Sequence, residues 1–242
     1  HYRNKDSFAK ITSNVDSLLK LGISVSIRIN TDPYTMERAD ELLDYFKEKG
    51  WLQYQNFKAY YALLRKEVPI KGENGEYSKE MFTQSSFFCT YLQKGLEKQG
   101  CGKVMCQDYS VRSVLTNMLL GKSTPYKSHF CGAQSGMIIF DPLGDIYSCW
   151  DVVGQREYRV GHYMPDFVLE DTFADKWFDS RVSKFSCIKC KYVLFCGGGC
   201  LANAIRTTGN LQSGTCNDYP RLFNAEIKYI YNEKIKKGID EN

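Results

Sequence analysis

The first thirty residues show two different periodicities of apolar side chains. Residues 6–22 carry one apolar stripe at helical spacing, which predicts a helix that ends at Gly22. Residues 23–30, ISVSIRIN, alternate between apolar and polar side chains, which predicts a strand. The helical stripe consists of Phe8, Ile11, Val15, Leu18 and Leu19.

A second helix and a second strand follow in the same order. Apolar positions predict a helix over 35–49, which Gly50 ends, and a strand over 57–64. Because strand, helix and strand succeed one another, we expect a parallel sheet in an α/β fold.

The remaining pattern is helical, except for one hairpin. A loop with Gly72 and Gly75 is expected before the next helix. The stretch MIIFDPLGDIYSCW predicts two short strands around Asp141-Pro142-Leu143-Gly144. The predicted helices lie at 78–98, 107–120 and 219–236. Near residue 125 the sequence changes from predicted helices to a hairpin and a cysteine-rich stretch, which predicts two domains, 1–125 and 126–242.

Length and charge exclude several classes of protein. The 242 residues suffice for a sizeable core, and a net charge of +4 without a basic tract gives no reason to expect nucleic acid. No apolar run reaches the roughly 18 residues that cross a bilayer. No leader is recognised after His1, so we expect a cytoplasmic, reducing setting and a chain that is part of a longer protein.

Ten cysteines are many for such a chain. Disulfide-dense proteins are usually short and poor in core, whereas this chain is long and has amphipathic helices. Metal or cluster ligation is therefore the better interpretation of the thiols.

Seven of the cysteines follow a regular spacing. The chain reads CX12GX4C, then CX2CX5CX3C within CIKCKYVLFCGGGC, and then one more cysteine. Thiolates are soft ligands that suit zinc and iron–sulfur clusters. Zinc ribbons usually repeat CX2C after about 15–20 residues, which this chain does not do. A zinc-stapled interaction domain stays open as an alternative.

This pattern resembles the seven-cysteine signature of SPASM domains, the C-terminal extensions of radical S-adenosylmethionine enzymes that modify peptides. The resemblance covers about residues 131–216. It implies two auxiliary 4Fe–4S clusters. Cys131, Cys149 and Cys200 would hold the first cluster, and Cys187, Cys190, Cys196 and Cys216 would hold the second.

The resemblance also implies the fold and the reaction. The first domain would be the C-terminal part of a radical S-adenosylmethionine partial barrel, and the second a small cysteine-rich α+β SPASM domain with a hairpin. A 5′-deoxyadenosyl radical would abstract hydrogen from a ribosomally synthesised peptide, which gives a thioether, a carbon–carbon cross-link or an oxidised residue. The expected reductant is a flavodoxin or ferredoxin-type protein.

The CX3CX2C motif that binds S-adenosylmethionine and a third cluster is absent from this sequence. We expect it in a missing N-terminal part. The alternative is a non-catalytic SPASM module for electron transfer or peptide binding. The first cluster has three implied thiolates, so its fourth iron is either open or bound by Cys89, Cys101 or Cys106.

Two further groups of residues are candidates. Ser26, Arg28 and Asn30 share one strand face, where they would contact S-adenosylmethionine or substrate, or else form a solvated polar face. Sulfatase maturases, which belong to the resembled family, place a catalytic Asp directly after the second cysteine. Here Trp150 takes that place, and Asp151 is the candidate catalytic base or else a turn carboxylate.

Overall fold

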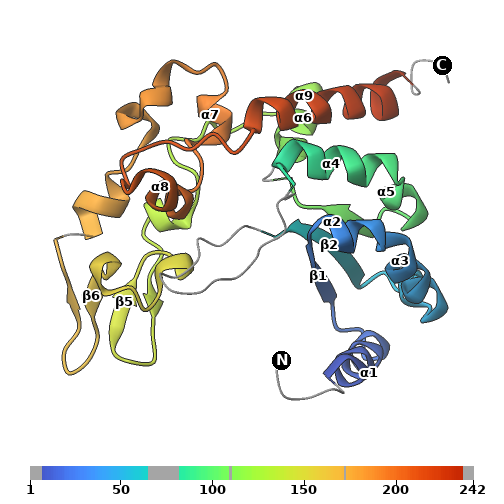
Figure 1. Cartoon of the computed structure of the whole chain (residues 1–242). Helices are drawn as coiled ribbons and strands as arrows, with labels where there is room; N and C mark the ends of the chain where they lie inside the picture. The colour runs from blue at the N-terminus through green and yellow to red at the C-terminus, as the bar shows by residue number, and fades with distance from the viewer. Residues whose placement is uncertain (1–6, 65–81, 109–110, 172, 237–242) are drawn as a thin grey trace. The chain divides into compact units, whose positions relative to one another are not determined.

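The computed structural model describes residues 7–64, 82–108, 111–171 and 173–236 and divides into two compact units (Figure 1). Unit 1 comprises residues 1–110 and 224–233, and unit 2 comprises residues 111–223 and 234–242. The domain boundary that the sequence predicts near residue 125 stays a prediction.

Unit 1 is built on a parallel sheet. Its strands β1 (Val25–Thr31), β2 (Phe57–Leu63) and β3 (Val104–Cys106) pair in that order. Val25 lies opposite Phe57, and Ala59 lies opposite Val104. The two predicted strands and their parallel pairing are confirmed. The third strand was not predicted, because three residues are too short to show an alternation.

The helices of unit 1 lie between these strands in the sequence. The helix predicted over 35–49 is wrong as a single element, because the chain breaks at Arg38. It also begins earlier, because the Asp32 carboxylate accepts the Thr35 N–H at 2.8 Å and Pro33 opens the first turn. The elements are α1 (Ser7–Lys20), α2 (Pro33–Glu37), α3 (Ala39–Glu48), the 3₁₀ turn η1 (Trp51–Gln53), α4 (Gln84–Gln93) and α5 (Leu96–Gln99).

The helix predicted over 78–98 is also divided. Its described part begins after Thr83, which caps α4, and breaks at Gly95, whose φ of 63° is left-handed. The start of this prediction and the loop with Gly72 and Gly75 lie outside the described residues.

Aromatic side chains fill the core of unit 1. The Phe46 ring lies 5.6 Å from that of Trp51 and 5.4 Å from that of Phe57, and all three are buried. The predicted stripe of α1 is buried only at Val15 and Leu19. Its other members, Phe8, Ile11 and Leu18, are exposed.

Unit 2 holds an antiparallel sheet. The strands β4 (Ile139–Phe140), β5 (Asp145–Tyr147), β6 (Gly161–His162) and β7 (Val168–Leu169) pair in sequence order. The predicted hairpin is therefore confirmed. Asp141 closes it, because its carboxylate accepts the N–H groups of Leu143 at 2.8 Å and of Asp145 at 2.9 Å.

The rest of unit 2 consists of short helical segments. The predicted helix over 219–236 is confirmed as α9 (Tyr219–Ile230) with a π-helical end, η8 (Tyr231–Lys236), of which residues 224–233 are assigned to unit 1. The others are α6 (Val111–Leu119), η2 (Gly132–Gln134), η3 (Trp150–Val152), η4 (Arg156–Tyr158), η5 (Phe173–Phe178), η6 (Val182–Lys184), η7 (Ser186–Lys189), α7 (Val193–Cys196) and α8 (Leu201–Thr208).

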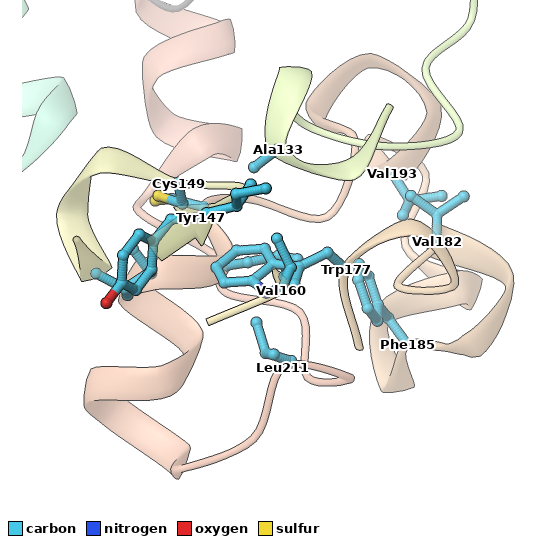
Figure 2. Packing of buried hydrophobic residues seen from close by; sticks show 14 residues of the cluster. Ala133, Tyr147, Cys149, Val160, Trp177, Val182, Phe185, Val193 and Leu211 are labelled. Atoms are coloured by element: carbon cyan, nitrogen blue, oxygen red, sulfur yellow. The ribbon is translucent and has the colours of Figure 1, made fainter. Parts of the chain in front are cut away.

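Two of the seven regularly spaced thiols belong to the core of unit 2. Figure 2 shows Cys149 in the same cluster of buried side chains as Tyr147, Val160 and Trp177, and Cys200 is also a member. None of the described helices is both long and apolar enough to span a bilayer.

Candidate metal centres

A turn of three glycines separates the last two cysteines of the CX2CX5CX3C run. Gly197, Gly198 and Gly199 have φ values of 74°, 85° and 82°, a region that other residues rarely adopt. Cys196 is the last residue of α7, and Cys200 precedes the first residue of α8. The turn therefore sends two thiols that are close in sequence in different directions.

Three of the thiols form what we call the three-thiol group: Cys131, Cys149 and Cys200. Burial is the main cause that raises the pKa of the Cys149 thiol to about 11. The nearby thiols of Cys200 and Cys131 raise this pKa further. Cys131, Cys149 and Cys200 directly precede η2, η3 and α8, respectively.

The remaining four, Cys187, Cys190, Cys196 and Cys216, form the four-thiol group. They line one cavity of about 250 Å³ together with Tyr192 and Tyr219. A single water needs only about 10–15 Å³ of such space, so the cavity has room for a polynuclear group. Four of the seven thiols thus line one cavity, and the assignment of all seven to two clusters stays a prediction.

Two thiols of the four-thiol group, those of Cys187 and Cys196, are harder to ionise than a free thiol. Burial raises the pKa of Cys196 to about 11 and also raises the pKa of Cys187. The thiol of Cys216 raises both values further. A bound metal cation reverses this balance, because coordination deprotonates a thiol.

The donors of both groups are all thiols, which suit zinc and iron–sulfur clusters. Among the described residues, no three His, Cys, Asp or Glu side chains are placed to hold one metal ion. Structural zinc needs four ligands at about 2.0–2.3 Å from one centre. Thiolates of a 4Fe–4S cluster bind separate irons of an inorganic core, so they converge less closely on one point. All-sulfur donors and the volume of the cavity agree with such a core.

Close backbone contacts fix the positions of these thiols. The Thr215 N–H donates to the Gly198 carbonyl at 2.8 Å, and the Thr215 hydroxyl donates to the Cys200 carbonyl at 3.1 Å. A Cβ at Gly214 would lie 2.6 Å from the Cys187 Sγ. Sequence analysis missed Gly214 and Thr215, although their place directly before Cys216 was a usable signal.

Asp151 lies beside the three-thiol group. Its backbone N–H donates to the Cys149 thiol, and its carboxylate also acts on the pKa of that thiol. On the other side the carboxylate forms an ion pair with Arg206 of α8 at 3.7 Å. Trp150, which separates Asp151 from Cys149 in sequence, is 74% exposed. Asp151 is therefore a partly exposed carboxylate near a buried thiol.

The candidate binding residues on β1 belong to unit 1. Ser26, Arg28 and Asn30 are exposed, and β1 is an edge strand of the sheet. The Arg28 guanidinium donates to the Asn30 side-chain oxygen at 3.0 Å. Their role as ligands of S-adenosylmethionine or substrate stays a prediction.

The three other cysteines also belong to unit 1. Cys106 is buried in β3, and its thiol lies 3.8 Å from the Gln107 carbonyl. Cys89 is half-buried in α4, and Cys101 is exposed. Their role as a fourth ligand of the three-thiol group stays a prediction.

Comparison with known proteins gives a fold and no family. No protein-family model matches the chain, and no curated protein matches it significantly. The fold is similar to that of native anSMEcpe with bound AdoMet, with a TM-score of 0.56 at 18% identity. That match covers 98% of this chain, which spans 62% of the anSMEcpe chain.

Two further solved structures are similar. One is native anSMEcpe with bound AdoMet and Kp18Cys peptide, at a TM-score of 0.54 and 18% identity over 97% of this chain and 63% of that chain. The other is SuiB of Streptococcus suis, at a TM-score of 0.49 and 16% identity over 86% of this chain and 48% of that chain. The two anSMEcpe structures, whose bound AdoMet is S-adenosylmethionine, therefore show that the fold of this chain is similar to that of anSMEcpe.

Proposed function

We propose that this chain is the C-terminal part of a radical S-adenosylmethionine enzyme that modifies a ribosomally synthesised peptide. The three-thiol group and the four-thiol group would each hold an auxiliary 4Fe–4S cluster. The segment that binds S-adenosylmethionine and the third cluster would lie outside this sequence.

One observation carries this proposal. Seven cysteines spread over residues 131–216 meet in two groups, and every donor in both groups is a thiol. Without a metal, burial leaves the thiols of Cys149 and Cys196 protonated at neutral pH, with pKa values of about 11. Metal coordination would explain why buried thiols gather in this way, because a bound metal deprotonates and holds them.

The fold comparison supports the same function. A protein with 18% identity and a similar fold binds AdoMet, and one of its structures also holds a peptide. The class of substrate proposed here, a peptide, agrees with that second structure. The bond that is formed remains one of the three that the SPASM resemblance implies.

The chain's own residues would hold and tune the bound groups. Cys149 and Cys200 lie in the buried core of unit 2, which excludes water from the three-thiol group. The N–H groups of Asp151 and Gly198 donate to the thiols of Cys149 and Cys196, and such hydrogen bonds tune reduction potentials. Clusters of this kind supply one-electron transfer, and an open iron also binds a substrate heteroatom.

Asp151 is the proposed base for a substrate proton near the three-thiol group. Its ion pair with Arg206 orients the carboxylate. Arg28, Asn30 and Ser26 are the proposed contacts to S-adenosylmethionine or to the peptide backbone.

The test is the metal content of the anaerobically purified full-length protein. We expect about eight irons and eight sulfides beyond those of the third cluster, with low-temperature EPR signals after reduction. About two zinc ions per chain with no EPR signal would contradict the proposal and leave a zinc-stapled interaction domain. Clusters without any cleavage of S-adenosylmethionine would instead indicate a non-catalytic electron-transfer module.

A further inference from the structure

Residues 180–217, which include the four-thiol group, carry charges of one sign, and the next carboxylate, Asp218, forms an ion pair with Arg221 at 3.6 Å. Between Asp179 and Asp218 the sequence contains no Asp or Glu. This stretch includes all four cysteines of the four-thiol group and the cations Arg181, Lys184, Lys189, Lys191 and Arg206. A segment of one charge sign creates a local field that attracts the opposite charge.

Three lysines of unit 2 lie near the cavity of the four-thiol group. Lys191 is exposed, and its ammonium lies 5.2 Å from the ring centre of Tyr192, a residue that lines the cavity. Lys189 is exposed in η7, whose first residues Ser186 and Cys187 also line the cavity. In the described part of the chain, neither Lys189 nor Lys191 has an ion-pair partner.

The third lysine comes from a distant part of the sequence. The Lys127 N–H donates to the Leu194 carbonyl of α7 at 2.7 Å. This bond places Lys127 beside α7, whose residues Val193 and Cys196 line the cavity. We call Lys127, Lys189 and Lys191 the lysine rim.

The four-thiol group lies nearer to solvent than the three-thiol group. Cys216 and Ser186 are exposed at the cavity, whereas Cys149 and Cys200 are buried. Electron transfer between proteins weakens steeply with distance, so an exposed site is the better point of exchange.

We propose that the lysine rim is the docking surface for an acidic one-electron carrier protein at the four-thiol group. This inference rests on the proposed function, because it needs a redox group in the cavity. In the electron transfer from the carrier to the enzyme, the reduced carrier loses one electron and the four-thiol site takes it up. No atom is transferred.

Neutralisation of the bound group is a simpler role for these lysines. Charges that only balance a buried anionic group pair with it and leave solvent. Lys189 and Lys191 instead remain exposed, as expected for charges that steer an approaching partner. A disordered acidic peptide would meet the same charges, but it would not need an exposed redox site.

The experiment uses the full-length holoenzyme and a reduced flavodoxin with an acidic surface. Electron transfer is followed by stopped flow, and binding by calorimetry, at ionic strengths of about 0.01 M and 1 M. At these values the Debye length is about 30 Å and 3 Å. The variants are Lys189→Glu/Lys191→Glu, the milder Lys189→Gln/Lys191→Gln, and Lys176→Glu as a control. Lys176 is an exposed lysine of unit 2 that does not line the cavity.

We expect the double charge reversal to slow electron transfer about tenfold or more at low ionic strength, with a matching loss of affinity. The milder variant should show a smaller loss, the control should stay within about twofold, and high ionic strength should remove the differences. Equal rates and affinities in wild type and both double variants would overturn the docking surface. So would an equal loss in the Lys176→Glu control.

Iron content and the midpoint potential of the four-thiol site are measured on every variant. A holoenzyme without iron at the four-thiol group overturns the proposed function, and this inference with it. Full iron with unchanged flavodoxin binding overturns only the docking surface. A shifted midpoint potential without any change of flavodoxin affinity would mean that the lysines neutralise the bound group. That result would also overturn the docking surface.

Discussion

A Cβ at Gly214 would lie 2.6 Å from the Sγ of Cys187. The two residues are distant in sequence, and their contact forms part of the wall of the four-thiol cavity. Because the nearest atom is the end of a flexible side chain, the protein can relieve the clash by turning Cys187. The contact therefore links a glycine that has no functional group to the position of a candidate ligand.

The first prediction is that Gly214→Ala empties the four-thiol group without unfolding the protein. The new Cβ displaces the Cys187 side chain rather than the backbone, so the free energy of unfolding should fall by about 1–3 kcal/mol. Iron bound by the two auxiliary sites should fall from about eight to about four per chain. Iron analysis and EPR measure this change.

Gly132→Ala is the matched control. Gly132 is adjacent to Cys131, but a Cβ there would meet Met137 only at 3.5 Å, an ordinary contact. Its iron content should equal that of wild type. Full iron in Gly214→Ala, or equal losses in both variants, would show that the Gly214 contact does not position a ligand.

The second prediction separates two causes of strain at glycines. Gly199 and Gly209 both have a left-handed φ, 82° and 69°. A Cβ at Gly199 would clash with the Thr215 carbonyl oxygen, whereas a Cβ at Gly209 meets nothing within 4 Å. Gly209→Ala should cost about 1–2 kcal/mol, and Gly199→Ala about 3 kcal/mol or more. Urea unfolding of both variants measures the difference, and equal losses would argue against the close contact.

The third prediction concerns Cys196 and Cys200, which are close in sequence and belong to different groups. Cys196→Ala should remove the EPR signal of the four-thiol site, and Cys200→Ala that of the three-thiol site. Each change should leave about four auxiliary irons per chain. Lys176→Ala, at an exposed position outside both groups, should keep about eight. Loss of the same signal in both variants would contradict the division into two groups.

The fourth prediction uses the helix cap of α2. The N–H of Thr35 donates to the Asp32 carboxylate and holds its pKa below the usual range. Asp32→Ala should lower the free energy of unfolding by about 1 kcal/mol at pH 7. Because the pKa is lower in the folded state, the contribution of ionisation is present above about pH 4 and is lost as the pH falls through the folded pKa.

Asp32→Asn is the control for this pH dependence. Asparagine keeps a capping oxygen but does not ionise, so its cap should stabilise equally at each pH. Unfolding of the three proteins is compared between pH 7 and pH 3. An Asp32→Ala deficit that is constant over this range would disprove the ionic part of the cap.

The fifth prediction tests Asp151 as the base. Asp151→Asn should keep iron and both EPR signals and should lower the rate of peptide modification about 10²–10⁴-fold. Mass spectrometry of the peptide product measures the rate. Arg206→Gln leaves the carboxylate in place without its partner at 3.7 Å and should reduce the rate less. A normal rate in Asp151→Asn would leave this residue with a structural role.

Several elements followed from the sequence because their causes are local. The alternation of residues 23–30, the hairpin at Asp141–Gly144 and the helix from Tyr219 depend on neighbours along the chain. The division of the predicted helices at Arg38 and Gly95 was missed. It depends on caps and backbone angles that a stripe of apolar residues does not record. Strand β3 was missed because a run of three residues is too short to show a periodicity.

The sequence by itself determined the number, spacing and softness of the candidate ligands, because these are properties of composition and order. The spacing alone did not show which thiols meet, and the two sets were implied only by the SPASM resemblance. The tertiary structure decided that Cys196 lies with Cys187 and Cys216, while Cys200 lies with Cys149. The reason is that three left-handed glycines turn the chain between Cys196 and Cys200. Hydrogen bonds from Thr215, far along the chain, then fix that turn.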